Sequence, residues 1–273
     1  MKMSPWRLLA APFMIAGIFV LYKTFSDPTW SWYLIPCVVM LAVLYVLSPQ
    51  IDWYWYKRNP PAMPKPLAMF FQKNMRFYQN LSVDQKQKFR DRVSLYMMAA
   101  DYMPKVFEKV PEDVKAIAAA CAVEITLGKE TFLFPNYEHI IVYPKAFPSP
   151  QYPRNIHPSE IYDHDGVIMF SAEHLVHGFV QPHRYFNVGL YEYARVFVDS
   201  YPTEPWPDLD EAIWTPLEQV SGFKKEAIFK YMNIDDISPL AVSIMFFFDF
   251  PEKFKETLPD LDALYSGIFN VER

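Results

Sequence analysis

Two long runs without a charged residue begin this chain, and they constrain its fold more than any other feature. The first run, residues 8–22, has 15 residues, and the second, residues 28–51, has 24. Twenty-four helical residues, at about 1.5 Å each, can cross a bilayer core of roughly 30 Å. Neither run has the polar face of a soluble helix pair, which is the alternative interpretation. The sequence therefore predicts a transmembrane helical hairpin with a tight turn near residues 26–28.

The residues that flank the two runs predict the orientation of this hairpin. Basic residues gather at its two ends (Lys2, Arg7, Lys57, Arg58 and Lys65), whereas the turn holds only Lys23, beside Asp27. The positive-inside rule then puts both ends in the cytoplasm. No A-x-A cleavage site follows the first run, which argues against a signal peptide. We expect a lipid bilayer to be a partner through residues 8–50.

Composition excludes some classes of function. The net charge is −5 and the pI is about 5.7, so a general nucleic-acid partner is not expected. Cys37 and Cys121 are the only cysteines and cannot form a disulfide framework.

A short Pro-rich stretch, "KRNPPAMPKP" at residues 57–66, is typical of a linker. We therefore expect a hairpin over residues 1–52, an interfacial segment and linker over 53–66, and one soluble domain over 67–273. Its fold class is predicted to be mainly α with a small β component.

Local signals in this domain predict its elements. Ser82 and Gln85 form a capping-box pattern before a helix, and "VPEDVKAIAAACAVEITLG", residues 110–128, predicts another. "EHIIVYPKAF" and "GVIMFS", at residues 138–147 and 166–171, are typical of short strands. The Pro-rich residues 148–166 are interpreted as a loop.

Five stretches together carry a resemblance to a known family. They are "LSVDQKQKFRDRV", "IAAACAVEITLG", "IIVYPKAF", "NVGLYEYARVF" and "LAVSIMFFFDFPEKFKETLPDLDALYSGIF". In this order they resemble the Mlc titration factor A (MtfA) family of zinc-dependent peptidases. The resemblance implies a metallopeptidase-like, zincin-like domain with an H-E-x-x-H helix and a Glu ligand from a later helix. It also implies a bacterial source.

The zinc ligands of that family are absent from the matching positions. In H-E-x-x-H, two His at i and i+4 on one helix face bind Zn²⁺ and the Glu activates its water. Here Glu192 keeps the Glu position, but the two His positions hold Tyr191 and Arg195, and the third ligand position falls on Met245. Arg cannot be a ligand and Met is a poor one for zinc. No metal is therefore favoured as a cofactor.

The spacing of Glu192 and Arg195 suggests what replaces the metal. Residues three apart on a helix can pair, so the guanidinium of Arg195 would compensate a buried Glu192. The alternative is that they form an exposed surface pair.

Histidines supply the rival hypothesis, with zinc as the alternative cofactor. His157, His164, His174, His177 and His183 precede the suspect helix, near Asp163, Asp165 and Glu173. His174 and His177, spaced H-x-x-H, would share a helix face and are the alternative metal ligands. Isolated helical histidines are more often packing or surface residues.

Three functional hypotheses follow. The first is an inactive, membrane-anchored relative of zinc peptidases that binds a protein or peptide or acts in regulation, at the bacterial inner membrane with its soluble domain in the cytoplasm. The second is an active metallopeptidase with a non-standard His-rich site. The third is a structural subunit of a membrane assembly.

Overall fold

The computed structural model describes residues 4–106, 108–162 and 165–271. The chain forms two compact units, Met1–Pro61 and Ala62–Arg273, called the N-terminal and C-terminal units below. The boundary lies inside the segment that we expected to be a linker. This segment is helical as far as Arg58 and without regular structure over 59–64.

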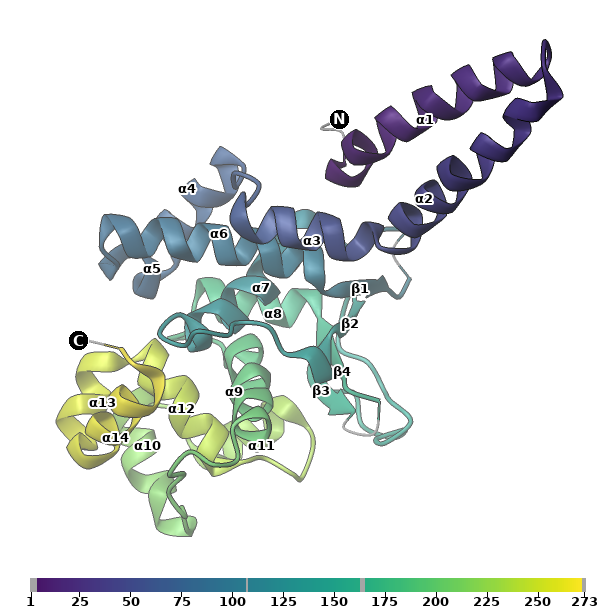
Figure 1. Ribbon diagram of the computed structural model, residues 1–273. Helices are drawn as coiled ribbons and strands as arrows, with labels where there is room; N and C mark the ends of the chain where they lie inside the picture. Colours follow the sequence, from purple (N-terminus) through teal and green to yellow (C-terminus); the bar gives the residue numbers. More distant parts are fainter. Residues whose placement is uncertain (1–3, 107, 163–164, 272–273) are drawn as a thin grey trace. The chain divides into compact units, whose positions relative to one another are not determined.

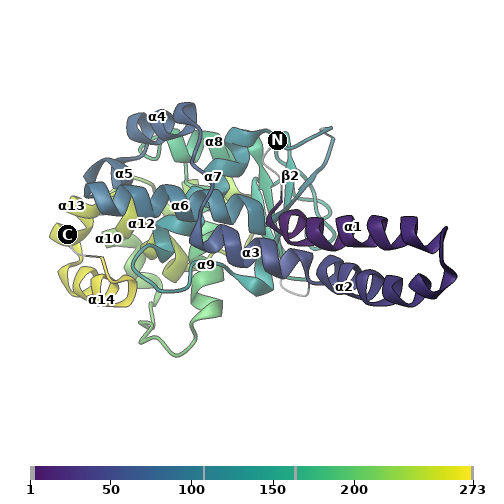
Figure 2. The ribbon, with the colours of Figure 1, turned by 45° about the horizontal axis from the view of Figure 1, so that its top comes forward.

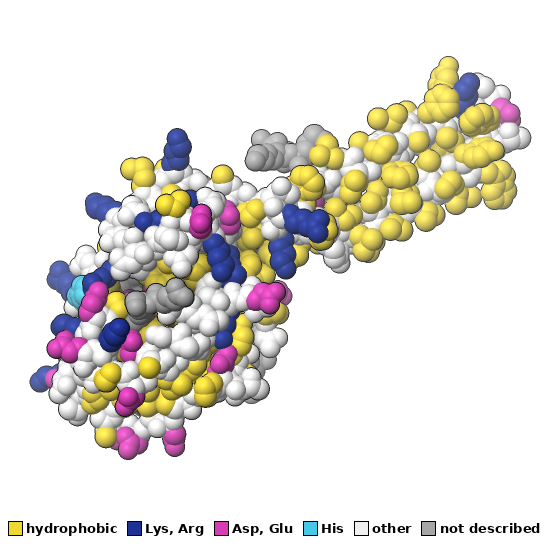
Figure 3. All heavy atoms as spheres, turned by 60° about the vertical axis from the view of Figure 1, so that its left-hand side comes forward, with side chains coloured by type: hydrophobic (Ala, Val, Ile, Leu, Met, Phe, Trp, Pro, Cys, Tyr) yellow, Lys and Arg dark blue, Asp and Glu magenta, His cyan; other side chains and the backbone are white. Residues whose placement is uncertain are grey.

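The N-terminal unit is a helical hairpin. Its elements are α1 (Pro5–Thr24), the 3-10 helix η1 (Pro28–Tyr33), α2 (Leu34–Val46) and α3 (Ser48–Arg58). The segments Pro5–Thr24 and Pro28–Val46 are each long and apolar enough to cross a membrane, with hydropathies of 1.5 and 1.7. Figure 3 shows hydrophobic side chains covering the surface of this hairpin. The predicted helical pair and its turn are confirmed.

The second apolar run, which we expected to be continuous, is divided where α3 begins. Pro28 lies in the first turn of η1 and Pro49 in the first turn of α3. A proline has no N–H to donate to the preceding turn, so it begins a helix more readily than it continues one. Asp52 of α3 closes the unit, because its carboxylate accepts hydrogen bonds from the Trp6 backbone N–H (3.1 Å) and from the Ser4 hydroxyl, at the start of α1.

A four-stranded sheet organises the C-terminal unit. Its order is β1 (Asp101–Pro104), β2 (His139–Tyr143), β4 (Val167–Ser171) and β3 (Ser159–Tyr162). The first three strands are parallel, and β3 runs antiparallel to β4 with Ser159 opposite Phe170. The expected strands β2 and β4 are confirmed. The interpretation of 148–166 as a continuous loop is wrong, because β3 lies within it, and β1 was not predicted.

Helices make up most of the C-terminal unit, as predicted (Figures 1 and 2). They are α4 (Lys65–Asn74), α5 (Arg76–Asn80), α6 (Val83–Ala99), α7 (Glu112–Thr126), η2 (Pro135–Tyr137), α8 (Ala172–Val180), α9 (Val188–Ser200), η3 (Glu211–Ile213), α10 (Trp214–Ser221), α11 (Lys225–Met232), α12 (Pro239–Asp249), α13 (Pro251–Thr257) and α14 (Pro259–Phe269). The capping box at Ser82 and Gln85 is present at the start of α6.

Helix α7 is the central support of α9. Its residues 116–126 are all buried, and the small side chains among them let neighbouring helices approach closely. Helix α7 packs against α6, α8 and α9, while α9 also contacts α8, α12 and the strands β3 and β4. The helix with the suspect motif is therefore buried on all sides over its first two turns, residues 188–194.

A glycine on α8 sets how closely the start of α9 can approach. A Cβ at Gly178 would lie 2.5 Å from the Phe186 carbonyl oxygen and 2.8 Å from the Asn187 Cα. These are backbone atoms, which cannot move aside as a side-chain end can. Asn187 is the N-cap of α9, so this contact fixes where the site helix begins.

We predict that Gly178→Ala destabilises the protein by about 1–3 kcal/mol through overpacking, although Ala is the better helix former by about 1 kcal/mol. Gly267→Ala in α14 is the matched control, since nothing lies within 4 Å of its added Cβ. The measurement is urea unfolding of the full chain in detergent. A Gly178→Ala variant as stable as Gly267→Ala would contradict this account.

Candidate functional site

The candidate site is built on α9, whose first turns are almost wholly buried. The Asn187 side chain caps the helix by accepting the Leu190 N–H at 3.2 Å. Tyr191 and Glu192 are both 0% exposed, and Arg195 follows one turn later at the helix surface. A buried carboxylate is costly unless it is paired and hydrogen-bonded, so its partners define the site.

Glu192 has two such partners. Its Oε1 accepts a hydrogen bond from the Ser159 hydroxyl of β3 at 2.7 Å, and its Oε2 accepts one from Nη1 of Arg195 at 3.1 Å. Burial raises the pKa of Glu192, while the charge of Arg195 and the two hydrogen bonds oppose that rise. The ion pair expected from the i,i+3 spacing is present, and it is not the exposed surface pair of the alternative, because only the Arg195 end reaches solvent.

Tyr191 joins α9 to α12. Its hydroxyl oxygen accepts the backbone N–H of Ser238, the N-cap of α12, at 3.1 Å. Burial raises the pKa of Tyr191, so the phenol is neutral. Met245 lies in the middle of α12, which packs against α9, and is itself 1% exposed.

A second buried polar pair lies beside Glu192. Nε2 of His157 lies 2.9 Å from Oε2 of Glu160, and Nδ1 lies 3.0 Å from the Asn155 carbonyl oxygen. A carbonyl can only accept, so Nδ1 carries a hydrogen. The Oε1 of Glu160 is buried with no hydrogen-bond partner in the described part of the chain, and the charge of Glu160 adds to the rise in the pKa of Glu192.

Sequence reasoning missed Ser159 and Glu160. Both lie on β3, inside the stretch that was interpreted as a loop, and 33 residues separate Ser159 from Glu192. The Ile161–Tyr162 pair, of high β propensity, was the only local signal for a strand there.

His174, His177 and His183 each make a separate local contact. Nδ1 of His174 lies 2.9 Å from the Ser171 hydroxyl, His177 stacks on Tyr185, and the edge of His183 meets Phe250. Burial lowers the pKa of His174; the charge of Glu173 opposes this fall, and a smaller effect of His177 adds to it. His164 and Asp163 lie outside the described residues.

Within residues 4–106, 108–162 and 165–271, no three His, Cys, Asp or Glu side chains form a group able to hold a metal. The His174/His177 site therefore stays a hypothesis that needs ligands from outside these residues.

A hollow of about 740 Å³ opens next to Arg195. Its lining comes from β3, from α9 and from the first turn of α12, through Ile161, Arg195, Val198 and Ala241 among others. Asp165 and Asp199 also line it, and Asp199 accepts a hydrogen bond from the Tyr137 hydroxyl at 2.9 Å. The hollow places a cation and two carboxylates beside an edge strand.

Comparison with protein families identifies the class of this chain. The family model of the glucose-regulated metallo-peptidases M90 matches residues 50–200, which is more than half of the chain, and the chain belongs to this family. It is thus a zinc-peptidase-like protein, as the resemblance implied. The match ends at the last residue of α9, so Met245 lies beyond it. The comparison with curated proteins finds no match.

The residues at the expected ligand positions do not fit a zinc ion. Zinc takes imidazole, thiolate or carboxylate donors, whereas these positions present a neutral phenol, a guanidinium and a thioether. The Tyr191 oxygen is already occupied by the Ser238 N–H, and the Arg195 guanidinium is bonded to Glu192.

We predict that Glu192 and Arg195 are energetically coupled. Arg195→Met leaves a buried carboxylate without its cation and costs about 3–5 kcal/mol. The double variant Glu192→Gln/Arg195→Met costs less than the sum of the two single variants. Urea unfolding of the four proteins measures the coupling, and strict additivity would show that the pair contributes nothing.

The loss of folding stability in the Arg195→Met variant, relative to the parent protein, should also depend on pH. A carboxyl group whose pKa is higher in the folded than in the unfolded state stabilises the fold while it is protonated. Its contribution to stability falls as the pH rises above the pKa of the unfolded state, which is about 4.3. Without Arg195 the pKa of Glu192 rises further, so the deficit relative to the parent widens between about pH 4 and pH 7. A deficit that is constant over this range would contradict the pairing.

Proposed function

We propose that this protein is a membrane-anchored relative of the zinc peptidases that has lost metal catalysis and acts as a protein- or peptide-binding or regulatory module. The observation that carries the proposal is the fully buried Glu192 carboxylate, held by Ser159 and Arg195. In a zinc peptidase the same Glu works as a general base on metal-bound water. Here its two oxygens are engaged by donors from the chain itself.

The charge balance of the site supports this proposal. An arginine is always protonated and brings a permanent positive charge to the carboxylate, as a metal would. It offers no open coordination position and cannot polarise a substrate carbonyl as a Lewis acid. A carboxylate neutralised in this way can stay buried without a metal and without metal catalysis.

The hollow beside Arg195 supports a role in binding. Ile161 of β3 lines it, and β3 is an edge strand of the sheet. Edge strands present unpaired backbone groups and can accept an extended peptide as an additional strand. The mixed charge of the hollow favours a polar segment of the partner over a purely apolar one.

The N-terminal unit supports the anchoring. Its two apolar helices are the candidate spans, and the basic residues outside the turn favour a cytoplasmic position for the C-terminal unit. The family resemblance adds the bacterial inner membrane to this proposal.

The central test is the metal content of the full chain purified in detergent, together with its activity on a mixture of unstructured peptides. We expect much less than one zinc per chain, and no hydrolysis that a chelator abolishes. Zinc near one per chain that survives dialysis, or chelator-sensitive cleavage, would overturn the proposal in favour of an active peptidase using His174 and His177.

We predict that the triple variant Tyr191→His, Arg195→His and Met245→Glu gains zinc binding. Two His at i and i+4 and a carboxylate from α12 would form a three-ligand site with an open fourth position. The control is the double variant without the Met245 change, which should bind more weakly. Zinc affinity is measured for parent, double and triple variants. A folded triple variant with the parent's affinity would show that the three positions do not converge.

We predict that both ends of the N-terminal unit lie in the cytoplasm. In a chain with Cys37→Ala and Cys121→Ala, single cysteines are placed at Ser26, in the exposed turn, and at Val83, which is 82% exposed in the C-terminal unit. An impermeant maleimide should label Ser26→Cys in intact cells, and Val83→Cys only after permeabilisation. Labelling of Val83→Cys in intact cells would contradict the predicted topology and indicate the opposite one.

A further inference from the structure

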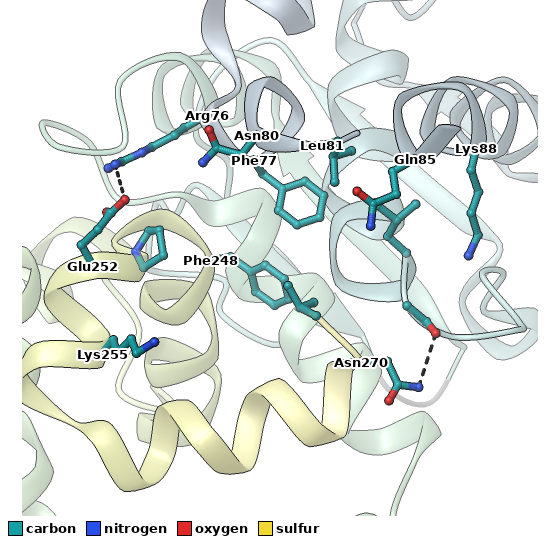
Figure 4. Close-up of a pocket in the computed structure, with 14 residues that line it drawn as sticks. Arg76, Phe77, Asn80, Leu81, Gln85, Lys88, Phe248, Glu252, Lys255 and Asn270 are labelled. Carbon is teal, nitrogen blue, oxygen red and sulfur yellow. Dashed lines mark hydrogen bonds and ion pairs between the residues drawn. The ribbon is translucent and has the colours of Figure 1, made fainter. Parts of the chain in front are cut away.

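A second hollow in the C-terminal unit, of about 660 Å³, shares no lining residue with the hollow beside Arg195. Helices α5, α6 and α13 surround it, together with the end of α7 and the segment that follows α14. Figure 4 shows that its side chains come from these elements, which lie far apart in the sequence, with Phe77 and Phe248 in the middle and Lys88 and Lys255 on opposite sides. Its volume lies within the range of about 300–1,000 Å³ of small-molecule sites.

The floor of this hollow is aromatic. Phe77 of α5 and Phe248 of α12 place their rings 6.0 Å apart, edge to face at 70°. Phe248 is 4% exposed and belongs to the core, whereas Phe77 is only partly covered. Leu81, Leu127 and Pro251 extend the apolar lining. A flat or short aliphatic group would therefore displace water from this floor.

The rim of the hollow is positively charged. Its charged lining residues are Arg76, Lys88, Lys255 and Glu252, which leaves a local excess of positive charge in a chain whose net charge is −5. Arg76 pairs with Glu252. Within the described residues neither Lys88 nor Lys255 has an ion-pair partner. Partial burial, and to a smaller extent the charge of Arg92, lower the pKa of Lys88.

We propose that this hollow binds a small organic anion, with its phosphate or carboxylate at the basic rim, paired with Lys88 or Lys255, and its ring or short apolar group lying on Phe77 and Phe248. Figure 4 places Lys88 of α6 and Lys255 of α13 on opposite sides of the hollow, so the rim attracts an anionic group from either side and one of the two ammonium groups can pair with it. The apolar floor selects against a bare inorganic ion. Three carboxamides at the wall, Asn80, Gln85 and Asn270, offer donors to further oxygens of the ligand.

The site acts independently of the proposed loss of metal catalysis. None of its residues contacts Glu192 or Arg195 through a described hydrogen bond or ion pair. A failure to bind anions would leave the proposed function untouched, and a zinc-dependent activity would leave this site untouched.

The test is calorimetric titration of the full chain in nanodiscs of zwitterionic phosphatidylcholine. The probes are phenyl phosphate and phenylacetate, which distinguish a phosphate from a carboxylate ligand. The controls are inorganic phosphate, which has the anionic group without the ring, and benzyl alcohol, which has the ring without the charge. We expect at least one aryl anion to bind with a Kd below about 1 mM, roughly tenfold or more tighter than either half. Added salt should weaken this binding.

Variants assign the binding to the hollow. Lys88→Gln/Lys255→Gln should weaken the aryl anion by about tenfold or more. Lys253→Gln is the matched control, because Lys253 is also on α13 and exposed but does not line the hollow. It should leave the Kd unchanged. If the thermal unfolding midpoint of the double variant shows a loss of fold, the two single Lys→Gln variants decide in its place.

Three results would overturn the proposal. The first is no binding of either aryl anion at 10 mM. The second is binding that the Lys88/Lys255 variant and the Lys253 control weaken equally. The third is inorganic phosphate binding as tightly as phenyl phosphate, which would reduce the site to a patch of surface charge.

Discussion

The buried ion pair of Glu192 with Arg195 is the constraint on which the other features of the site depend. Glu192 is fully buried, and an uncompensated carboxylate there would cost several kcal/mol. Its compensation requires Arg195 one turn later on α9 and Ser159 on β3 at the same time. The edge strand and the site helix are therefore held in one relative position, and the core helix α7 and Gly178 limit how α9 can adjust.

The positions that resemble zinc-ligand positions each have a structural role of their own. The Tyr191 hydroxyl accepts the backbone N–H of Ser238, the N-cap of α12. Arg195 neutralises Glu192, and the buried Met245 fills the core between helices. Such side chains stabilise the fold through packing and hydrogen bonds. In a metal site the same stabilisation comes in part from the metal, whose binding energy is folding energy. Under the proposed function, packing and hydrogen bonds at these positions take the place of stability that a metal would supply.

Features that depend on short-range signals were predictable from the sequence. The apolar hairpin, the capping box of α6, the Ala-rich α7 and the ion pair of Glu192 with Arg195 all follow from residues within one or two turns of each other. Strand β3 did not follow, because its four residues are held by pairing with β4 and its surroundings are rich in proline. Ser159 and the His157–Glu160 pair depend on that strand, so local patterns could not reveal them. The basic hollow was equally hidden, because its walls come from helices at opposite ends of the C-terminal unit's sequence.

The carboxylate of Asp52 has a mechanical consequence. It binds the Ser4 hydroxyl and the Trp6 N–H, so the first residues of α1 are fastened to α3, the helix through which the chain continues. A force applied to the chain beyond Arg58 would therefore act on both α1 and α2, instead of unfolding α2 first. Under the proposed membrane anchoring, the two helices should therefore resist extraction together, since both carry the load at the same time.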